Sequence, residues 1–117
     1  MTGPARNGAL VYSDNFQELS MFYREFFGMK VLREAEEFVS LDNDGFNVVV
    51  HAAPFKLPED GFNAVKLFLT VNSLDVAKRK AAELGGQVFE GEWENSMFKV
   101  CNIADPDGNQ IQIREFL

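Results

Sequence analysis

The side chain best suited to acid–base chemistry in this sequence is His51, the only histidine in the chain. Its imidazole is the one group that titrates near neutral pH without help from its surroundings. A two-histidine, one-carboxylate iron site cannot form within a chain that has a single histidine. Cys101 is the only cysteine, so a thiolate cage for a metal is excluded as well. No catalytic residue is assigned; His51 is the candidate base, beside stray carboxylates such as Glu115.

A second group of candidates comes from the alternation of side chains along the predicted strands. Neighbouring side chains of a strand point to opposite sides, so an apolar row on one face leaves the intervening residues to the other. The residues expected to face a helix are Leu10 and Tyr12, Val48 and Val50, Leu67, Leu69 and Val71, and Ile111 and Ile113. The opposite faces then carry the mixture of polar and aromatic groups that lines small-molecule pockets. These predicted ligand-binding residues are Asn47, His51, Lys66, Phe68, Gln110, Gln112 and Arg114.

Each of these candidates has an ordinary structural alternative. Lys66 and Arg114 could be charges at a sheet edge in water, and the two glutamines could simply solvate the sheet. His51, near a strand end, could be a hydrogen-bonded surface histidine. Trp93, in the acidic stretch 90–94, could lie over the binding face or form a contact between subunits. The sequence leaves these alternatives open.

The elements that position the candidates follow from helix caps, spacing and turn residues. Asp14 with Gln17 is typical of a helix start, and apolar residues at helical spacing continue to Phe27 before Gly28. A second helix is predicted from Ser73 to the glycine pair 85–86. Strands are predicted at 9–13, 29–34, 37–42, 46–52, 65–71, 87–93, 97–103 and 110–116.

The two halves of the chain carry the same landmarks in the same order. The pairs are Asp14 and Ser73, Gly28 and Gly86, and Gly45 and Gly108, separated by 59, 58 and 63 residues. Such near-constant offsets predict an internal repeat, with chance similarity between two short stretches as the alternative. We expect one domain over 1–117, with a first module at about 7–52, a linker at 53–63 and a second module at about 64–117. The helix of each module should cover one face of its sheet and leave the other free to line a cavity.

Five short motifs follow these landmarks: Ser13-Asp14, Phe22-Tyr23, Phe27-Gly28-Met29, Glu83-Leu84-Gly85-Gly86 and Asp105-Pro106-Asp107-Gly108-Asn109. In order and spacing they resemble the vicinal oxygen chelate superfamily of glyoxalases, bleomycin resistance proteins and extradiol dioxygenases. The resemblance covers nearly the whole chain. It implies an α+β fold in which two βαβββ modules form a curved mixed sheet around a cup, and it implies a homodimer.

Metal-dependent members of that superfamily place ligands on the first and last strand of each module. The resemblance maps these positions to Asn7, Val49, Lys66 and Gln112. None of the four is histidine, glutamate or aspartate, and Lys66 would bring a positive charge to a cation site. We therefore expect no metal and no other cofactor, with a metal site improvised around His51 as the alternative.

Charge and composition limit the partners that this chain can bind. Its formal net charge is −7, so phosphate backbones and anionic membranes would repel it. The one basic cluster, Lys78 to Lys80, is expected to be a solvated helix face. No apolar run has spanning length, no secretory signal is recognisable, and the single cysteine fits a reducing compartment. We expect a cytoplasmic protein with neither a nucleic-acid nor a membrane partner.

These observations favour a metal-independent protein that binds a small molecule. Lys66 and Arg114 would attract an anionic group, and Phe68 would support an apolar body. A glyoxalase-like lyase or isomerase, with a metal at shifted positions or His51 as base, is the enzymatic alternative. A regulatory or interaction module is a third. Among binding proteins, an acidic cup for a cationic ligand would instead use Glu90, Glu92 and Glu94.

Overall fold

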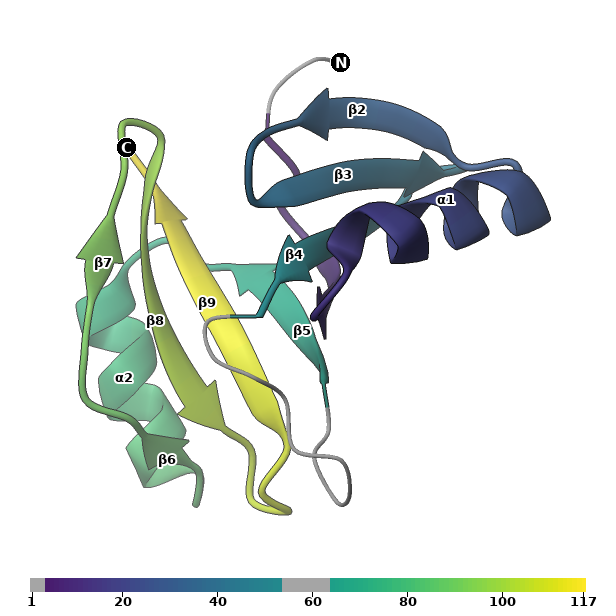
Figure 1. The fold of residues 1–117 in the computed structure, drawn as a ribbon. Helices are drawn as coiled ribbons and strands as arrows, with labels where there is room; N and C mark the ends of the chain where they lie inside the picture. The colour runs from purple at the N-terminus through teal and green to yellow at the C-terminus, as the bar shows by residue number, and fades with distance from the viewer. Residues whose placement is uncertain (1–3, 54–63) are drawn as a thin grey trace. The chain divides into compact units, whose positions relative to one another are not determined.

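The chain divides into two units of the same design, Met1–Val65 and Lys66–Leu117 (Figure 1). The computed structural model describes residues 4–53 and 64–117. Each unit carries a helix directly after its first strand, and each sheet contains one parallel pair among antiparallel pairs. The predicted α+β class with mixed sheets is therefore confirmed. The predicted linker lies outside the described residues from position 54 onward.

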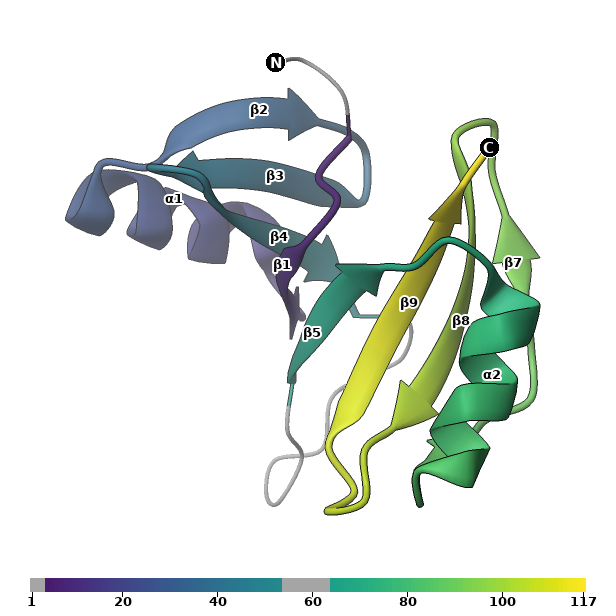
Figure 2. The same ribbon diagram turned by 180° about the vertical axis from the view of Figure 1, so that it is seen from behind.

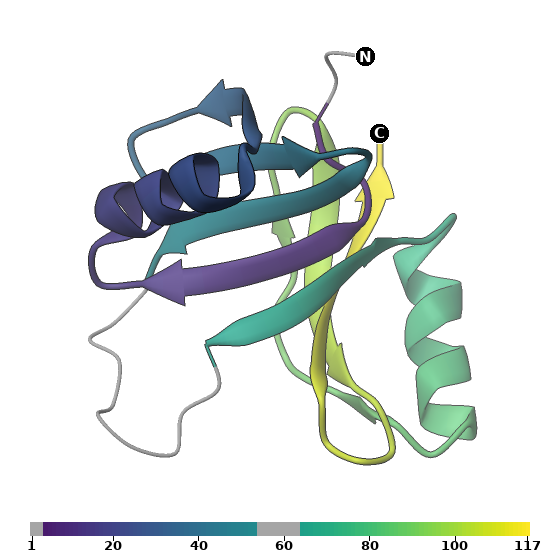
Figure 3. The same cartoon turned by 90° about the vertical axis from the view of Figure 1, so that its right-hand side faces the viewer.

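The first unit packs helix α1 against one face of a sheet with strand order β2-β3-β4-β1 (Figure 3). Strands β1 and β4 are parallel, and the other neighbours are antiparallel. Its buried core is built from aliphatic side chains of β1, β3 and β4, with Leu19 and Tyr23 of α1 packed on them. The elements are β1 Gly8–Ser13, α1 Phe16–Phe27, β2 Lys30–Glu34, β3 Phe38–Asn43 and β4 Phe46–Ala52.

The second unit repeats this design with strand order β5-β9-β8-β6, and β7 also pairs with β8. Helix α2 lies on one face of this sheet (Figure 2), where Leu74 packs with Cys101 and Ile113. Neither helix in the described parts of the chain is long and apolar enough to cross a membrane. The elements are β5 Val65–Thr70, α2 Leu74–Glu83, β6 Gln87–Val88, β7 Trp93–Glu94, β8 Phe98–Ala104 and β9 Gln110–Phe116.

The helix ends are set by side-chain and glycine caps. Asn15, not the predicted Asp14, caps α1: its Oδ1 accepts from the Glu18 backbone N–H at 3.2 Å and its Nδ2 donates to the Glu18 carboxylate at 3.1 Å. The capping box is thus one residue later than predicted. Gly28 ends α1 at φ +68°, and Ser73 caps α2 by accepting from the Val76 N–H, both as predicted.

Two strand predictions were wrong. The strand predicted at 87–93 breaks into β6 and β7, since Gly91 between them has a φ of +108°, which a continuous strand does not permit. In β1, Leu10 was expected to face the helix, but Val11 does so, beside its register partner Val50. Leu10 and Val11 are both buried, at 2% and 9% exposure, so β1 has no polar face that would reveal its orientation.

An aromatic cluster remains exposed on the C-terminal half of α1. Phe22, Phe26 and Phe27 keep 53%, 71% and 51% of their surface in solvent. The ring centroids of Phe22 and Phe26 lie 5.4 Å apart, and those of Phe26 and Phe27 lie 4.7 Å apart. At ~200 Å² per ring the cluster exposes on the order of 350 Å² of apolar surface. That is close to half of the ~800 Å² that each partner buries in a standard interface.

We expect a second copy of the chain to cover this aromatic cluster. Sedimentation at micromolar concentration should then give twice 13.2 kDa, and Phe26→Ser should shift the protein towards the monomer. Gln17→Ser, also exposed on α1, is the matched control and should leave the dimer intact. A wild-type protein that sediments at 13.2 kDa would contradict the homodimer.

Candidate functional site

The candidate site lies on the face of the second unit's sheet that points away from α2. Ile111 and Ile113 of β9 pack towards α2, as predicted from their alternation. Gln112 and Arg114 therefore project from the opposite face. The parallel register pairs Phe68 of β5 with Gln112, which puts the two side chains on the same side. We call this surface the cation face and define it by Lys66, Phe68, Phe98, Asn102, Gln112 and Arg114.

Arg114 is held between two aromatic rings on the cation face. Its guanidinium carbon lies 4.1 Å from the ring centroid of Phe68 and 4.7 Å from that of Phe98. Its Nε donates to Oε1 of Gln112 at 2.9 Å. Arg114 keeps only 7% of its surface exposed, and Phe68 keeps none. Stacking and the hydrogen bond together fix the position of this charge.

Lys66 brings a second cation to the same place. Its Nζ donates to Oδ1 of Asn102 at 3.1 Å, and Asn102 is the register partner of Gln112 on β8. The ammonium thus reaches across β9 to the level of Gln112, where the Arg114 guanidinium is also anchored. Burial lowers the pKa of Lys66 because desolvation disfavours its charged form.

The carboxylates of this unit lie elsewhere. Among the strand positions described on the cation face, none is aspartate or glutamate. Glu115 points to the α2 side, where its Oε1 accepts from the Leu74 backbone N–H at 2.8 Å and caps the helix. Glu92 forms a 2.7 Å ion pair with Lys78 of α2. Glu94 pairs in register with Lys99, on the α2 side. This arrangement contradicts an acidic binding face built on Glu92 and Glu94, and it occupies Glu115, the stray carboxylate considered as a base.

Gln110 is the remaining second-unit candidate. It opens β9 opposite Ala104, on the same side of the sheet as Gln112, but it is exposed. No hydrogen bond of its side chain to the described residues is present. Gln110 therefore lies at the margin of the cation face.

The first unit holds the other two candidates, His51 and Asn47, on the face of β4 away from α1. The His51 ring lies between Phe38, stacked at 6.0 Å, and Tyr12, edge-on at 5.8 Å. Its Nδ1 donates to the Ala52 carbonyl at 2.7 Å, since a carbonyl can only accept. The neutral ring then keeps a lone pair on Nε2. Asn47 instead donates to Oδ1 of Asp42 at 3.2 Å, within the β3–β4 hairpin.

Two residues of the cation face, Phe98 and Asn102, were missed by the sequence predictions. Their signal was the alternation of β8, where Cys101 and Ile103 pack towards α2 and leave Phe98 and Asn102 on the other side. Cys101 is fully buried, as expected of a small packed side chain, and burial raises the pKa of its thiol. Trp93 pairs in register with Val100, which puts it on the side of the cation face with 54% of its surface exposed.

Comparisons with known proteins place this geometry in a familiar fold. A family model described as a glyoxalase-like domain matches residues 9–114. A glyoxalase/bleomycin resistance protein/dioxygenase superfamily member from Vibrio splendidus 12B01 is 18% identical, with a TM-score of 0.69 over 96% of this chain and 98% of that one. A structure named NAD-dependent benzaldehyde dehydrogenase from Legionella pneumophila is 17% identical, with a TM-score of 0.75 over 95% and 99%. The methylmalonyl-CoA epimerase from Mycobacterium tuberculosis is 18% identical, with a TM-score of 0.62 over 97% and 87%. No curated protein matches the sequence.

The donor set of these strands does not fit a catalytic metal. The described residues contain no group of three histidine, cysteine, aspartate or glutamate side chains close enough to share an ion. On the second unit the mapped ligand positions carry the Lys66 ammonium and the Gln112 amide, with the Arg114 guanidinium beside them. On the first unit, β1 directs Leu10 to the side of Val49, so the two mapped strands offer no carboxylate or thiolate there, and His51 is the one histidine on that face.

We predict that divalent metals do not stabilise the fold. Binding to a real site raises stability by mass action, so Zn²⁺, Ni²⁺, Fe²⁺ and Mn²⁺ should each leave the melting temperature unchanged. The measurement is a thermal melt of chelator-treated protein with and without each metal. A saturable rise that EDTA reverses would show that ligands exist which the mapping overlooks.

The partly buried Lys66 should also make stability depend on pH. With its folded pKa below the unfolded value, the unfolded chain binds more protons between these two pKa values, so this residue makes stability rise with pH in that window. Urea unfolding of wild type and Lys66→Met should show the wild type gaining relative to the variant as pH rises towards 10.5, the ordinary value for lysine. A free-energy difference that stays constant over this range would mean that Lys66 is not desolvated.

Proposed function

Since this chain belongs to the glyoxalase-like domain family, we propose that it is a metal-independent binding protein for a small organic anion. One observation carries the proposal: on a sheet face without described carboxylates, Lys66 and Arg114 hydrogen-bond to Asn102 and Gln112, which are register partners on neighbouring strands. The Arg114 guanidinium also stacks on the rings of Phe68 and Phe98. Charged donors held in place form stronger hydrogen bonds to a carboxylate than neutral donors do. The ligand's anionic group would lie near Gln112 and its apolar body on Phe98, which is partly exposed, whereas Phe68 is fully buried.

Desolvation supports an anion over a neutral ligand. Taking Lys66 out of water disfavours its charge, and a bound carboxylate would restore a favourable environment for it. The Arg114 guanidinium is already oriented by Phe68, Phe98 and Gln112, so little side-chain freedom is left to lose on binding. A cationic ligand would meet repulsion from both groups. The face therefore favours a carboxylate with an apolar substituent.

The enzymatic alternative, a lyase or isomerase of the same family, depends on His51. Its Nδ1–H is fixed on the Ala52 carbonyl, and the free electron pair on Nε2 could accept a proton from a bound compound. His51 belongs to the first unit and the cation face to the second. The binding proposal does not require His51, which separates the two functions experimentally.

The proposal predicts that phenylacetate binds and that benzylamine does not. Lys66→Met and Arg114→Met should each weaken phenylacetate binding by about 1–3 kcal/mol, the cost of losing a direct contact to a charged group. Methionine keeps much of the apolar stem, so both variants should remain folded by circular dichroism. Arg79→Met, which removes an exposed cation from α2, is the matched control and should bind normally. Isothermal titration calorimetry supplies the affinities.

Two results would overturn this assignment. Tight benzylamine binding that survives both substitutions would show that the face does not select anions. Solvent deuterium entering the bound compound, and lost in His51→Gln, would instead indicate the isomerase.

A further inference from the structure

Helix α2 covers only part of the sheet face on which it lies. It contacts β6, β8 and β9. Leu67 and Leu69 of β5 are register partners of Ile111 and Ile113, so they point to the α2 side. They nevertheless keep 49% and 39% of their surface exposed. The sequence predicted that the helix would cover these leucines, and it does not. An apolar strip is left beside the helix.

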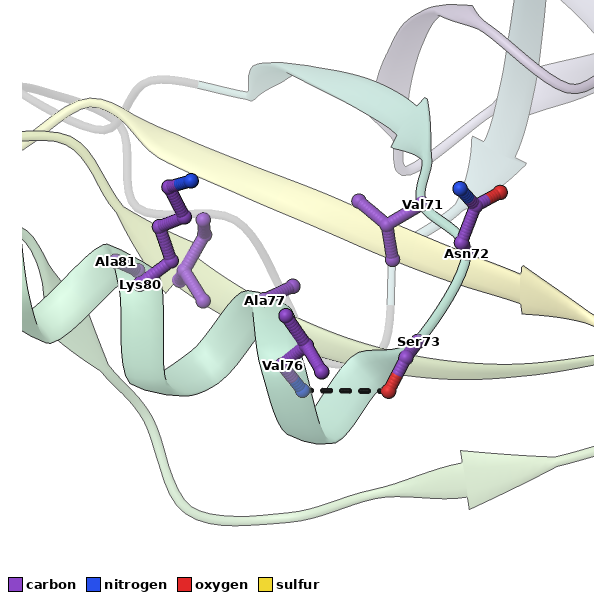
Figure 4. A pocket seen from close by; sticks show the side chains of 8 residues that line it. Val71, Asn72, Ser73, Val76, Ala77, Lys80 and Ala81 are labelled. Carbon is purple, nitrogen blue, oxygen red and sulfur yellow. Dashed lines mark hydrogen bonds between the residues drawn. The ribbon is translucent and has the colours of Figure 1, made fainter.

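An open groove of about 490 Å³ lies along α2 on this face (Figure 4). That volume falls within the ~300–1,000 Å³ of small-molecule sites. Its walls are aliphatic, and Asn72 and Ser73 form a polar end at the start of α2, where Ser73 Oγ accepts from the Val76 N–H at 3.2 Å. The groove is lined by Val71, Val76, Ala77, Ala81 and Ile103, with Lys80 beside them.

Among the residues that the structure describes, Lys80 is the one charged residue that lines the groove. It belongs to the last turn of α2 and is exposed, and Figure 4 shows its ammonium at the opposite end from Ser73. Within the part of the chain that the structure describes, Lys80 forms no ion pair. Aliphatic walls with one cation at one end match a molecule with an apolar chain and one negative head.

We propose that this groove binds an aliphatic monocarboxylate. The carboxylate contacts the Lys80 ammonium, and the chain lies on Val76, Ala77 and Ile103. The site is separate from the cation face, because it lies on the other side of the same sheet. It differs in chemistry as well, since the described lining of the groove contains no aromatic residue and no second cation. The proposal does not depend on the ligand of the cation face.

The test is an NMR titration of ¹⁵N-labelled full-length protein with octanoate, and with octanamide as its uncharged analogue. We expect octanoate to shift the amide signals of Ala77, Lys80 and Ala81, and octanamide to bind more weakly. Lys80→Glu should weaken octanoate about fivefold, the scale of an exposed ion pair. Arg79→Glu changes the charge equally one residue away, outside the groove lining, and should change octanoate binding less. Both substitutions are on the helix surface and should leave the fold intact.

Three other outcomes would overturn the groove proposal. Each of them can be told apart from a failure of the function proposed for the cation face. Shifts confined to Phe68 and Arg114 that vanish in Lys66→Met would place octanoate on the cation face instead. Equal binding of octanoate and octanamide, or no effect of Lys80→Glu, would exclude the carboxylate contact. Shifts of groove signals with protein concentration alone would show that a second copy of the chain occupies the groove.

Discussion

The packing of Ile113 against Leu74 and Cys101 is the contact on which the second unit depends. It fixes which face of β9 meets the helix. A strand has two faces, and a shift of one residue exchanges them. With Ile113 on the helix side, Arg114 must project to the other face and Glu115 must return to the helix. A slip of one residue would exchange the cation and the carboxylate. Burial of one isoleucine thus determines both the helix cap and the binding face.

This alternation separates opposite charges that neighbour each other in sequence. The chain as a whole has a formal net charge of −7, yet one sheet face gathers Lys66 and Arg114. The arrangement is costly for the empty protein, because cations withdrawn from water lose hydration. Aromatic faces and amide oxygens offset part of that cost by meeting the cations with partial negative charge. The side chains of the cation face are thereby held in fixed positions.

Sequence patterns predicted the elements that have one buried and one polar face. The bounds of β4 and β9 were obtained to the residue, and in β9 polar and aliphatic positions alternate from Gln110 to Arg114. Strand β1 was misoriented because both of its faces are buried, and a continuous strand at 87–93 was ruled out by the backbone of Gly91. The cap of α1 is Asn15 and not the predicted Asp14, because either side chain can accept a hydrogen bond from the first turn of the helix. Within the candidate site, the alternation placed Lys66 and Arg114 on the sheet face where the structure has them. Asn47 instead hydrogen-bonds within a hairpin, and the alternation that places Phe98 and Asn102 was not applied.

The contact between Glu115 and the Leu74 N–H spans 41 positions of the chain, and it has a consequence for how the protein is made. Helix α2 leaves the ribosome well before β9. Until β9 follows, the first turn of α2 lacks its cap from Glu115, and the apolar stripe of the helix lacks its packing partner Ile113. Pairing of distant segments is slow compared with helix formation, since a long loop must close first. The second unit therefore cannot complete its core until the final strand has been released. A ribosome that stalls before β9 has emerged would hold a chain with exposed hydrophobic surface, a target for chaperones.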